Sequence, residues 1–71
     1  MKYSLRQLEI FLAIARQQNI SRAAETLHMS QSAASAALQN LEQAYNISLF
    51  NRIGKKLELN EVGKTLRSKA E

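Results

Sequence analysis

The chain has 71 residues, enough for one small domain whose core is only marginally sufficient by itself. Ten Lys and Arg residues against six acids give a net charge of +4, which favours a polyanionic partner without identifying one. The absence of Cys excludes a disulfide framework and a thiolate metal site. The apolar run Ile10–Ala15 is too short to target or span a membrane.

A first helix is predicted to begin after Ser4, because the tetrapeptide Ser4–Gln7 matches a capping box in which the two side chains bond each other's backbone N–H. One face of this helix carries apolar side chains at three- and four-residue steps, namely Leu5, Leu8, Phe11, Leu12 and Ala15. Ile10 and Ile14 form a second apolar strip, so we expect the helix to be covered on two sides. The polar segment Arg16–Asn19 predicts the turn that ends it.

Two helices joined by a tight turn are predicted between Ser21 and Tyr45. Ser21 is expected to cap the first of them, which runs to about Leu27. His28 occupies the turn, where a left-handed backbone is often needed and where His is more frequent than most non-glycine residues. Ser30 is expected to cap the second helix.

The second of these helices has two unlike faces. One face is apolar and is predicted to point into the core, with Ala34, Ala37, Leu38, Leu41 and Tyr45. The other face is small, polar and free of acids, and its residues are the candidates for reading DNA bases, namely Gln31, Ser32, Ser35, Ala36 and Gln39. Amides, hydroxyls and methyl groups suit the floor of a major groove, where Gln31 can bond adenine through two hydrogen bonds. The competing interpretation is an ordinary solvated helix surface.

The segment Phe50–Leu59 predicts a two-stranded ribbon with a basic tip, which we call the wing. Two short apolar segments flank Ile53–Lys56, and Gly54 permits a tight reversal. Asn46 is a suitable stop for the preceding helix because Asn tolerates a left-handed backbone. Leu49 and Phe50 are expected to close the core.

Six residues are candidates for contact with DNA phosphates, or with the minor groove in the case of the wing. They are Ser21, Arg22, Ser30, Arg52, Lys55 and Lys56. Free N–H groups and the helix dipole favour phosphate at helix starts, and basic side chains beside a groove-reading helix favour the DNA backbone. The competing interpretation is that the serines are plain caps and that the cations are merely solvated.

A final helix is predicted to begin after Asn60, which can cap it. Val62, Leu66 and Ala70 recur at four-residue steps, so they form one apolar stripe. The stripe reaches the last residues without a stop signal, which indicates a surface that needs a partner.

The order of helix, helix-turn-helix, wing and trailing helix resembles the N-terminal DNA-binding domain of LysR-type transcriptional regulators. The resemblance is carried by Leu5-Arg6-Gln7-Leu8 with Phe11, Ser21-Arg22-Ala23-Ala24-Glu25 with Leu27, Ser30-Gln31-Ser32-Ala33 with Ser35, Leu41-Glu42, Leu49-Phe50 with Arg52, and Asn60 with Gly63. Three positions depart from the family pattern. Ser32 stands where many members carry Pro, Ala36 where many carry a basic residue, and Asn60 where Thr is usual.

The resemblance implies a mainly α, winged helix-turn-helix fold with a three-helix core, a short two-stranded wing and a C-terminal linker or dimerisation helix. Residues 1–59 would form the DNA-binding domain, and residues 60–71 would begin the linker helix. Dimerisation would use the stripe formed by Val62, Leu66 and Ala70.

The partners implied by the resemblance are double-stranded promoter DNA with a short imperfect palindrome and a second copy of the chain. No cofactor, metal or membrane is expected, and the place of action would be the nucleoid in a bacterial cytoplasm. Family members normally continue into an effector-binding domain of about two hundred residues, the size of one or two ordinary domains. We therefore expect this chain to be one domain of a longer protein and any small-molecule effector to act through the missing part.

Two other classes of function compete with DNA binding. A helical protein-interaction or dimerisation module would use the apolar strips of the first and last helices, but the acid-free second helix and the basic wing favour DNA. Catalysis is not expected, because one His without Asp or Cys cannot build a nucleophilic triad or an ordinary zinc site. Single-strand binders display aromatic residues on an exposed sheet, whereas four aromatics here are interpreted as core or core-edge, namely Tyr3, Phe11, Tyr45 and Phe50.

Overall fold

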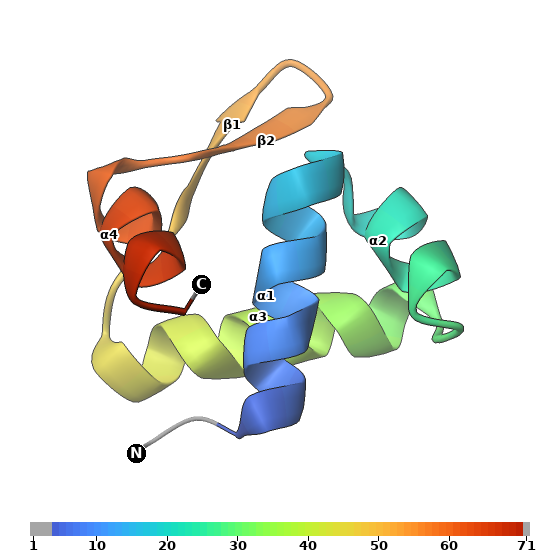
Figure 1. The fold of residues 1–71 in the computed structure, drawn as a ribbon. Coiled ribbons are helices and arrows are strands. Elements are labelled where there is room, and N and C mark those ends of the chain that lie inside the picture. Colours follow the sequence, from blue (N-terminus) through green and yellow to red (C-terminus); the bar gives the residue numbers. More distant parts are fainter. Residues whose placement is uncertain (1–3, 71) are drawn as a thin grey trace.

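The computed structural model describes residues 4–70, so the expectation for Tyr3 lies outside the described residues. The elements in chain order are α1 (Leu5–Gln17), α2 (Ile20–Thr26), α3 (Gln31–Tyr45), β1 (Phe50–Ile53), β2 (Lys56–Leu59) and α4 (Glu61–Ala70). In Figure 1, α3 crosses α1, and α2 and α4 lie on opposite sides of α1. The antiparallel pair of strands extends away from the helices. The mainly α, winged helix-turn-helix fold is therefore confirmed.

The capping box at the start of α1 is confirmed. Ser4 Oγ accepts from the backbone N–H of Gln7 at 3.0 Å, and Gln7 Oε1 accepts from the N–H of Ser4 at 2.9 Å. The expected burial of Leu5 is wrong, since Leu5 is 75% exposed because the first turn of α1 extends past α3 (Figure 1). Two-sided coverage is confirmed further along α1, where Ile10, Phe11, Ala13 and Ile14 are buried.

The connection from α1 to α2 is shorter than predicted. Arg16 and Gln17 still belong to α1, and the turn consists of Gln18, which is left-handed with φ 57°, and Asn19. Asn19 Oδ1 accepts from the backbone N–H of Arg22 at 2.9 Å. The expectation that Ser21 caps α2 is therefore wrong. The helix begins at Ile20, one residue before Ser21, and Asn19 is the residue that accepts from the backbone N–H of Arg22 in its first turn.

The turn between α2 and α3 follows the prediction. His28 is left-handed with φ 57°, and Ser30 Oγ accepts from the backbone N–H of Ala33 at 3.1 Å. On α3 the core face is confirmed for Ala34, Ala37, Leu38 and Leu41, which are buried or half-buried. Tyr45 lies on the same side of α3 by spacing, but its expected burial is wrong. It is 40% exposed, because it is the last residue of α3 and lies at the rim of a groove beside α4.

The wing is a two-stranded antiparallel hairpin in which Phe50 pairs with Leu59 and Ile53 pairs with Lys56. The reversal is confined to two residues, of which Gly54 is left-handed with φ 62°. The base of the wing belongs to the core. The ring centroids of Phe50 and Phe11 are 5.7 Å apart, and Leu49, Phe50 and Leu57 are buried. The wing is thus attached to the helices at its base and free at its tip.

Asn60 joins the start of α4 to the chain that enters the wing. Its Oδ1 accepts from the backbone N–H of Gly63 at 2.8 Å, which confirms the predicted cap, and its Nδ2 donates to the carbonyl oxygen of Ser48 at 2.7 Å. Leu66 then packs against the core. Across residues 4–70, no helix combines the length and apolar character needed to cross a membrane.

Candidate nucleic-acid interface

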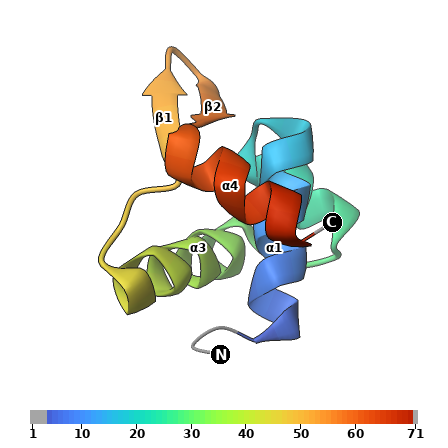
Figure 2. The same cartoon turned by 60° about the vertical axis from the view of Figure 1, so that its left-hand side comes forward.

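One backbone hydrogen bond joins the wing to a distant part of the chain. The N–H of Leu57 in β2 donates to the carbonyl oxygen of Gln18 at 3.0 Å. This bond holds the middle of the wing against the turn that precedes α2. In Figure 2 the tip of the wing stands clear of the helices.

A hollow of about 350 Å³ lies between the starts of α2 and α3 and the wing. We call it the wing hollow, and its lining is Asn19, Ile20, Ser21, Gln31, Ser35, Arg52, Gly54, Lys55 and Leu57. The hollow brings together candidates from three separate elements of the chain. Among the described residues no carboxylate lines it, so its polar surface consists of amides, hydroxyls and two cations.

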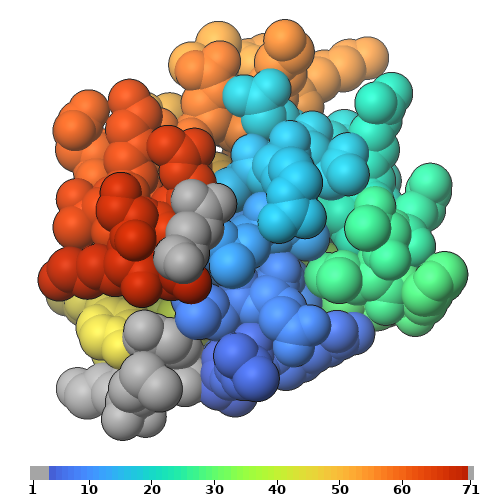
Figure 3. Space-filling view, viewed as in Figure 1, coloured from blue at the N-terminus to red at the C-terminus, as the bar shows by residue number. Residues whose placement is uncertain are grey.

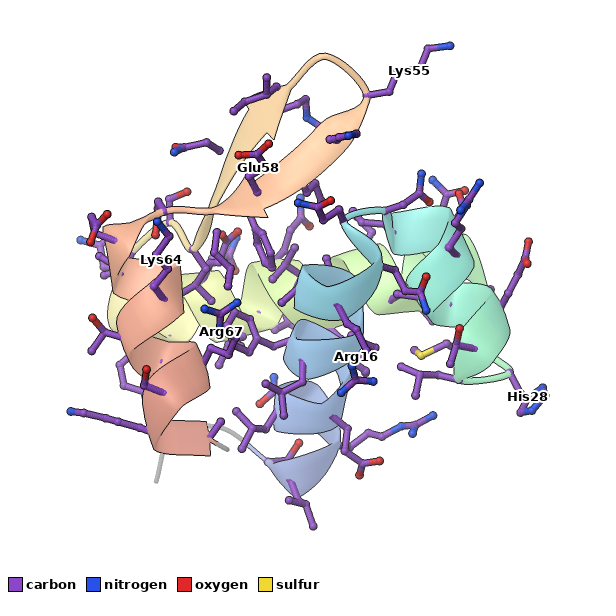
Figure 4. All side chains as sticks on the ribbon, turned by 45° about the horizontal axis from the view of Figure 1, so that its top comes forward. Arg16, His28, Lys55, Glu58, Lys64 and Arg67 are labelled. Atoms are coloured by element: carbon purple, nitrogen blue, oxygen red, sulfur yellow. The ribbon has the colours of Figure 1, made fainter. Side chains whose placement is uncertain are left out.

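A second hollow adjoins the first, and we call it the basic hollow. Its lining is Gln17, Gln18, Asn19, Arg22, Lys55 and Lys56. Three of the four predicted phosphate-contacting cations, Arg22, Lys55 and Lys56, thus share one surface. Lys55 extends from the tip of the wing in Figure 4, with its ammonium group accessible to a ligand outside the protein.

The outer face of α3 lies on the surface, as predicted, with one exception. Gln31, Ser32, Ala36 and Gln39 are exposed, whereas Ser35 is half-buried. Ser32 and Ala36 do not line the wing hollow. Gln39 lies further along α3, in another hollow that it shares with Ser35 and Arg52, so Arg52 lies between the two ends of this helix face.

Hydrogen bonds hold several of these polar groups in place. Ser21 Oγ donates to Gln31 Oε1 at 2.7 Å, which joins the first turn of α2 to the first turn of α3. Ser30 Oγ lies 3.4 Å from Ser32 Oγ at the start of α3. Glu42, the acid in the α3 sequence, accepts a hydrogen bond from the backbone N–H of Leu49 through Oε2 at 2.7 Å, and it lines the hollow that contains Gln39.

Asn19 was missed by the sequence reasoning. It lines both hollows and caps α2. A signal for it exists, because Asn directly before an apolar residue that opens a helix is a common N-cap. Ser21 is an equally good cap by residue type, and the spacing of the two does not decide between them. Gln17 and Gln18 were missed because the prediction placed them in a featureless turn.

The predicted dimerisation stripe is partly accessible. Val62 is 44% exposed, and Leu66 and Ala70 are half-buried. A groove of about 400 Å³ runs beside α4, lined by Tyr45, Ile47, Val62, Thr65, Leu66 and Lys69. In Figure 3, α4 forms one flank of the molecule, on the opposite side of α1 from α2.

Comparison with known proteins finds matches over nearly the whole chain. The family model described as "Bacterial regulatory helix-turn-helix protein, lysR family" matches residues 5–64. The RuBisCO operon transcriptional regulator of Allochromatium vinosum is 48% identical over 64 residues, which cover 90% of this chain and 21% of that protein. The chain thus spans about a fifth of the length of such curated relatives.

Solved structures also match this chain over most of its length. The crystal structure of a transcriptional regulator of the LysR family from Eggerthella lenta DSM 2243 superposes with a TM-score of 0.87 at 38% identity, covering 93% of this chain and 94% of that one. The BenM DBD in its complex with benA site 1 DNA superposes with a TM-score of 0.90 at 30% identity, covering 94% of this chain and 75% of that one.

Proposed function

This chain belongs to the lysR family of bacterial regulatory helix-turn-helix proteins, and from that premise we propose that it binds double-stranded promoter DNA in a sequence-specific way. In this proposal α3 enters the major groove and the wing contacts the adjacent backbone or minor groove. One observation carries the proposal. The acid-free outer face of α3 and the cations of the wing border the same hollow, so a duplex can meet both at once.

We propose a division of labour between the residues of this surface. Base edges are read by the outer face of α3, namely Gln31, Ser32, Ser35, Ala36 and Gln39. Phosphates are bound by the helix starts and the wing, namely Arg22, Ser30, Arg52, Lys55 and Lys56. Support comes from the clustering of Arg22, Lys55 and Lys56 around the basic hollow, because cations without a nearby carboxylate retain their attraction for phosphate.

We also propose that the chain acts as a dimer. Residues 1–59 would form the DNA-binding domain, and residues 60–71 would begin a linker helix that pairs with a second copy through Val62, Leu66 and Ala70. The apolar groove beside Val62 supports this, because a small domain with an accessible apolar groove gains stability when a partner covers it. Two-fold symmetry would place two copies of α3 about 34 Å apart, or a multiple of that distance, on one face of the duplex.

The proposed role is that of the DNA-binding part of a bacterial transcriptional regulator acting on the nucleoid in the cytoplasm. It needs no cofactor and no catalytic residue. The relatives are several times longer than this chain, so any response to a small-molecule effector would reside in sequence outside it.

Selection of bound duplexes from a random pool tests the proposal most directly. The chain is expected to enrich an imperfect palindrome whose half-sites are separated by whole helical turns. Its affinity for that sequence should fall steeply with salt, because neutralised phosphates release counterions. An unchanged pool after several rounds, together with affinity that does not respond to salt, would favour a protein-interaction module instead.

A further inference from the structure

The hydrogen bond between Ser21 and Gln31 fixes a side chain that the proposed function places against DNA. The donor–acceptor distance of 2.7 Å is typical of a good O–H···O bond. A serine hydroxyl carries a single hydrogen, and the hydroxyl of Ser21 donates it to Gln31 Oε1. The bond spans ten residues of sequence and joins two helices, so local backbone geometry alone does not impose it.

The bond distinguishes the two ends of the Gln31 amide. The carboxamide has an oxygen that accepts and an NH₂ group that donates two hydrogen bonds. Because Oε1 accepts from Ser21, the oxygen end of the amide is turned toward α2, and the Nε2 end is turned toward a ligand. The charged side chains that line the wing hollow are Arg52 and Lys55, and both of them only donate hydrogen bonds.

We propose that Ser21 is a positioning residue for base recognition, which orients Gln31 so that it acts as a hydrogen-bond donor. This inference rests on the proposed function. In the major groove guanine offers the acceptors N7 and O6, and thymine offers O4, without a donor beside them on the same base. Adenine places its N6 donor beside N7, so bidentate reading of adenine needs the amide oxygen to face the base, whereas the bond to Ser21 turns that oxygen toward α2.

The proposal replaces two expectations drawn from the sequence. Gln31 reads guanine or thymine rather than making a bidentate pair with adenine. Ser21 contributes through Gln31 rather than by donating to a phosphate, because its hydrogen is already engaged.

Selections from a random duplex pool with four variants test this inference. The base pair at which Gln31→Ala relaxes the preference identifies the position that Gln31 reads. The unaltered chain is expected to enrich there a G·C pair, or a T·A pair whose affinity does not change when its adenine is replaced by 7-deazaadenine, which lacks the N7 that bidentate reading of adenine uses. Ser21→Ala should reduce discrimination at that one position by about threefold to tenfold, the value of one neutral hydrogen bond. Ser21→Thr should restore it because the hydroxyl returns, and Ser68→Ala on the opposite flank, in α4, serves as the matched serine control.

Each remaining outcome has a definite meaning. If Ser21→Ala keeps the full preference at the position that Gln31→Ala relaxes, Ser21 does not position the amide, although the proposed DNA binding stands. If Ser21→Ala lowers the melting temperature and weakens binding to operator and random duplex equally, the bond stabilises the packing of α2 on α3 and has no role in base recognition. Enrichment of a T·A pair whose affinity falls when its adenine is replaced by 7-deazaadenine would refute the donor assignment. If no duplex is enriched, both this inference and the proposed function fail.

Discussion

Glu42 Oε2 accepts a hydrogen bond from the backbone N–H of Leu49 at a distance of 2.7 Å. Glu42 lies on α3 and Leu49 lies at the entrance to the wing, with its side chain fully buried. The bond therefore fastens the segment that leads from the helix proposed to read DNA to the wing proposed to contact the backbone. Glu42 is half-buried and also lines the hollow that Gln39 shares with Ser35 and Arg52.

Loss of this bond should destabilise the fold. Glu42→Ala is expected to lower the free energy of unfolding by about 1.5–3 kcal/mol, because the backbone N–H of Leu49 loses its hydrogen bond to a charged acceptor. Urea unfolding measures the change. Glu25→Ala on the exposed surface of α2 is the matched control and should stay within about 0.5 kcal/mol. Equal losses in the two variants would show that the contact contributes nothing.

Gly63 should not tolerate a methyl group. Alanine normally stabilises a helix relative to glycine by about 1 kcal/mol. At this position a Cβ would collide with the carbonyl oxygen of Leu49 and come within 2.7 Å of Leu59 Cδ2. Gly63→Ala is therefore expected to destabilise the chain by about 1–3 kcal/mol in thermal unfolding, the usual cost of overpacking.

Gly54 at the tip of the wing provides the control for the Gly63 variant. It has a φ of 62°, and no atom lies within 4 Å of the position that a Cβ would take, so Gly54→Asn meets open space in a conformation that Asn accepts. We expect its melting temperature to change little. A rise in melting temperature for Gly63→Ala would mean that helix propensity outweighs the close approach to Leu49.

Gln31 and Lys55 should affect DNA binding in different ways. Gln31→Ala should weaken binding to the selected operator by about 1–3 kcal/mol and binding to random duplex much less, because base contacts carry the discrimination. Lys55→Ala should weaken binding to both duplexes and reduce the slope of log affinity against log salt by about one. Fluorescence anisotropy over a range of salt concentrations measures both effects. Equal losses on both duplexes for Gln31→Ala would remove its base-reading role.

A charge on the α4 groove should prevent self-association. Val62→Asp places a carboxylate among apolar side chains that the proposed dimer would bury. Burial of an unpaired charge is costly, so we expect the dimer dissociation constant to rise about tenfold or more in sedimentation experiments. Ser68→Asp, outside the groove lining, carries the same charge and should leave the constant nearly unchanged. An unaltered dimer in Val62→Asp would place the interface elsewhere.

Local rules predicted most of the helix ends. Ser4, Ser30 and Asn60 cap helices, and His28 and Asn46 adopt the left-handed backbone that stops them. These features are readable because unpaired backbone N–H groups at a helix end must find partners within a few residues. At the start of α2 both Asn19 and Ser21 could serve as the N-cap, and the prediction from sequence named the wrong one.

Periodicity predicted which face of a helix is buried but not how far along the helix the burial extends. Leu5 and Tyr45 lie on the correct sides of α1 and α3 by spacing, yet both are exposed. Each stands at an end of its helix, where the neighbouring elements stop. The extent of coverage depends on the lengths and crossing of separate helices, which no single stretch of sequence contains.

The sequence by itself determined the order of the elements, the acid-free face of α3 and the basic tip of the wing, because these follow from residue spacing and local backbone chemistry. Only the tertiary structure decided which of these features meet. The bond from Leu57 to Gln18 carries the wing to the start of α2, and the bond from Ser21 to Gln31 selects the end of an amide that faces outward. Both join groups that are distant along the chain, and their distances are set by how the helices pack.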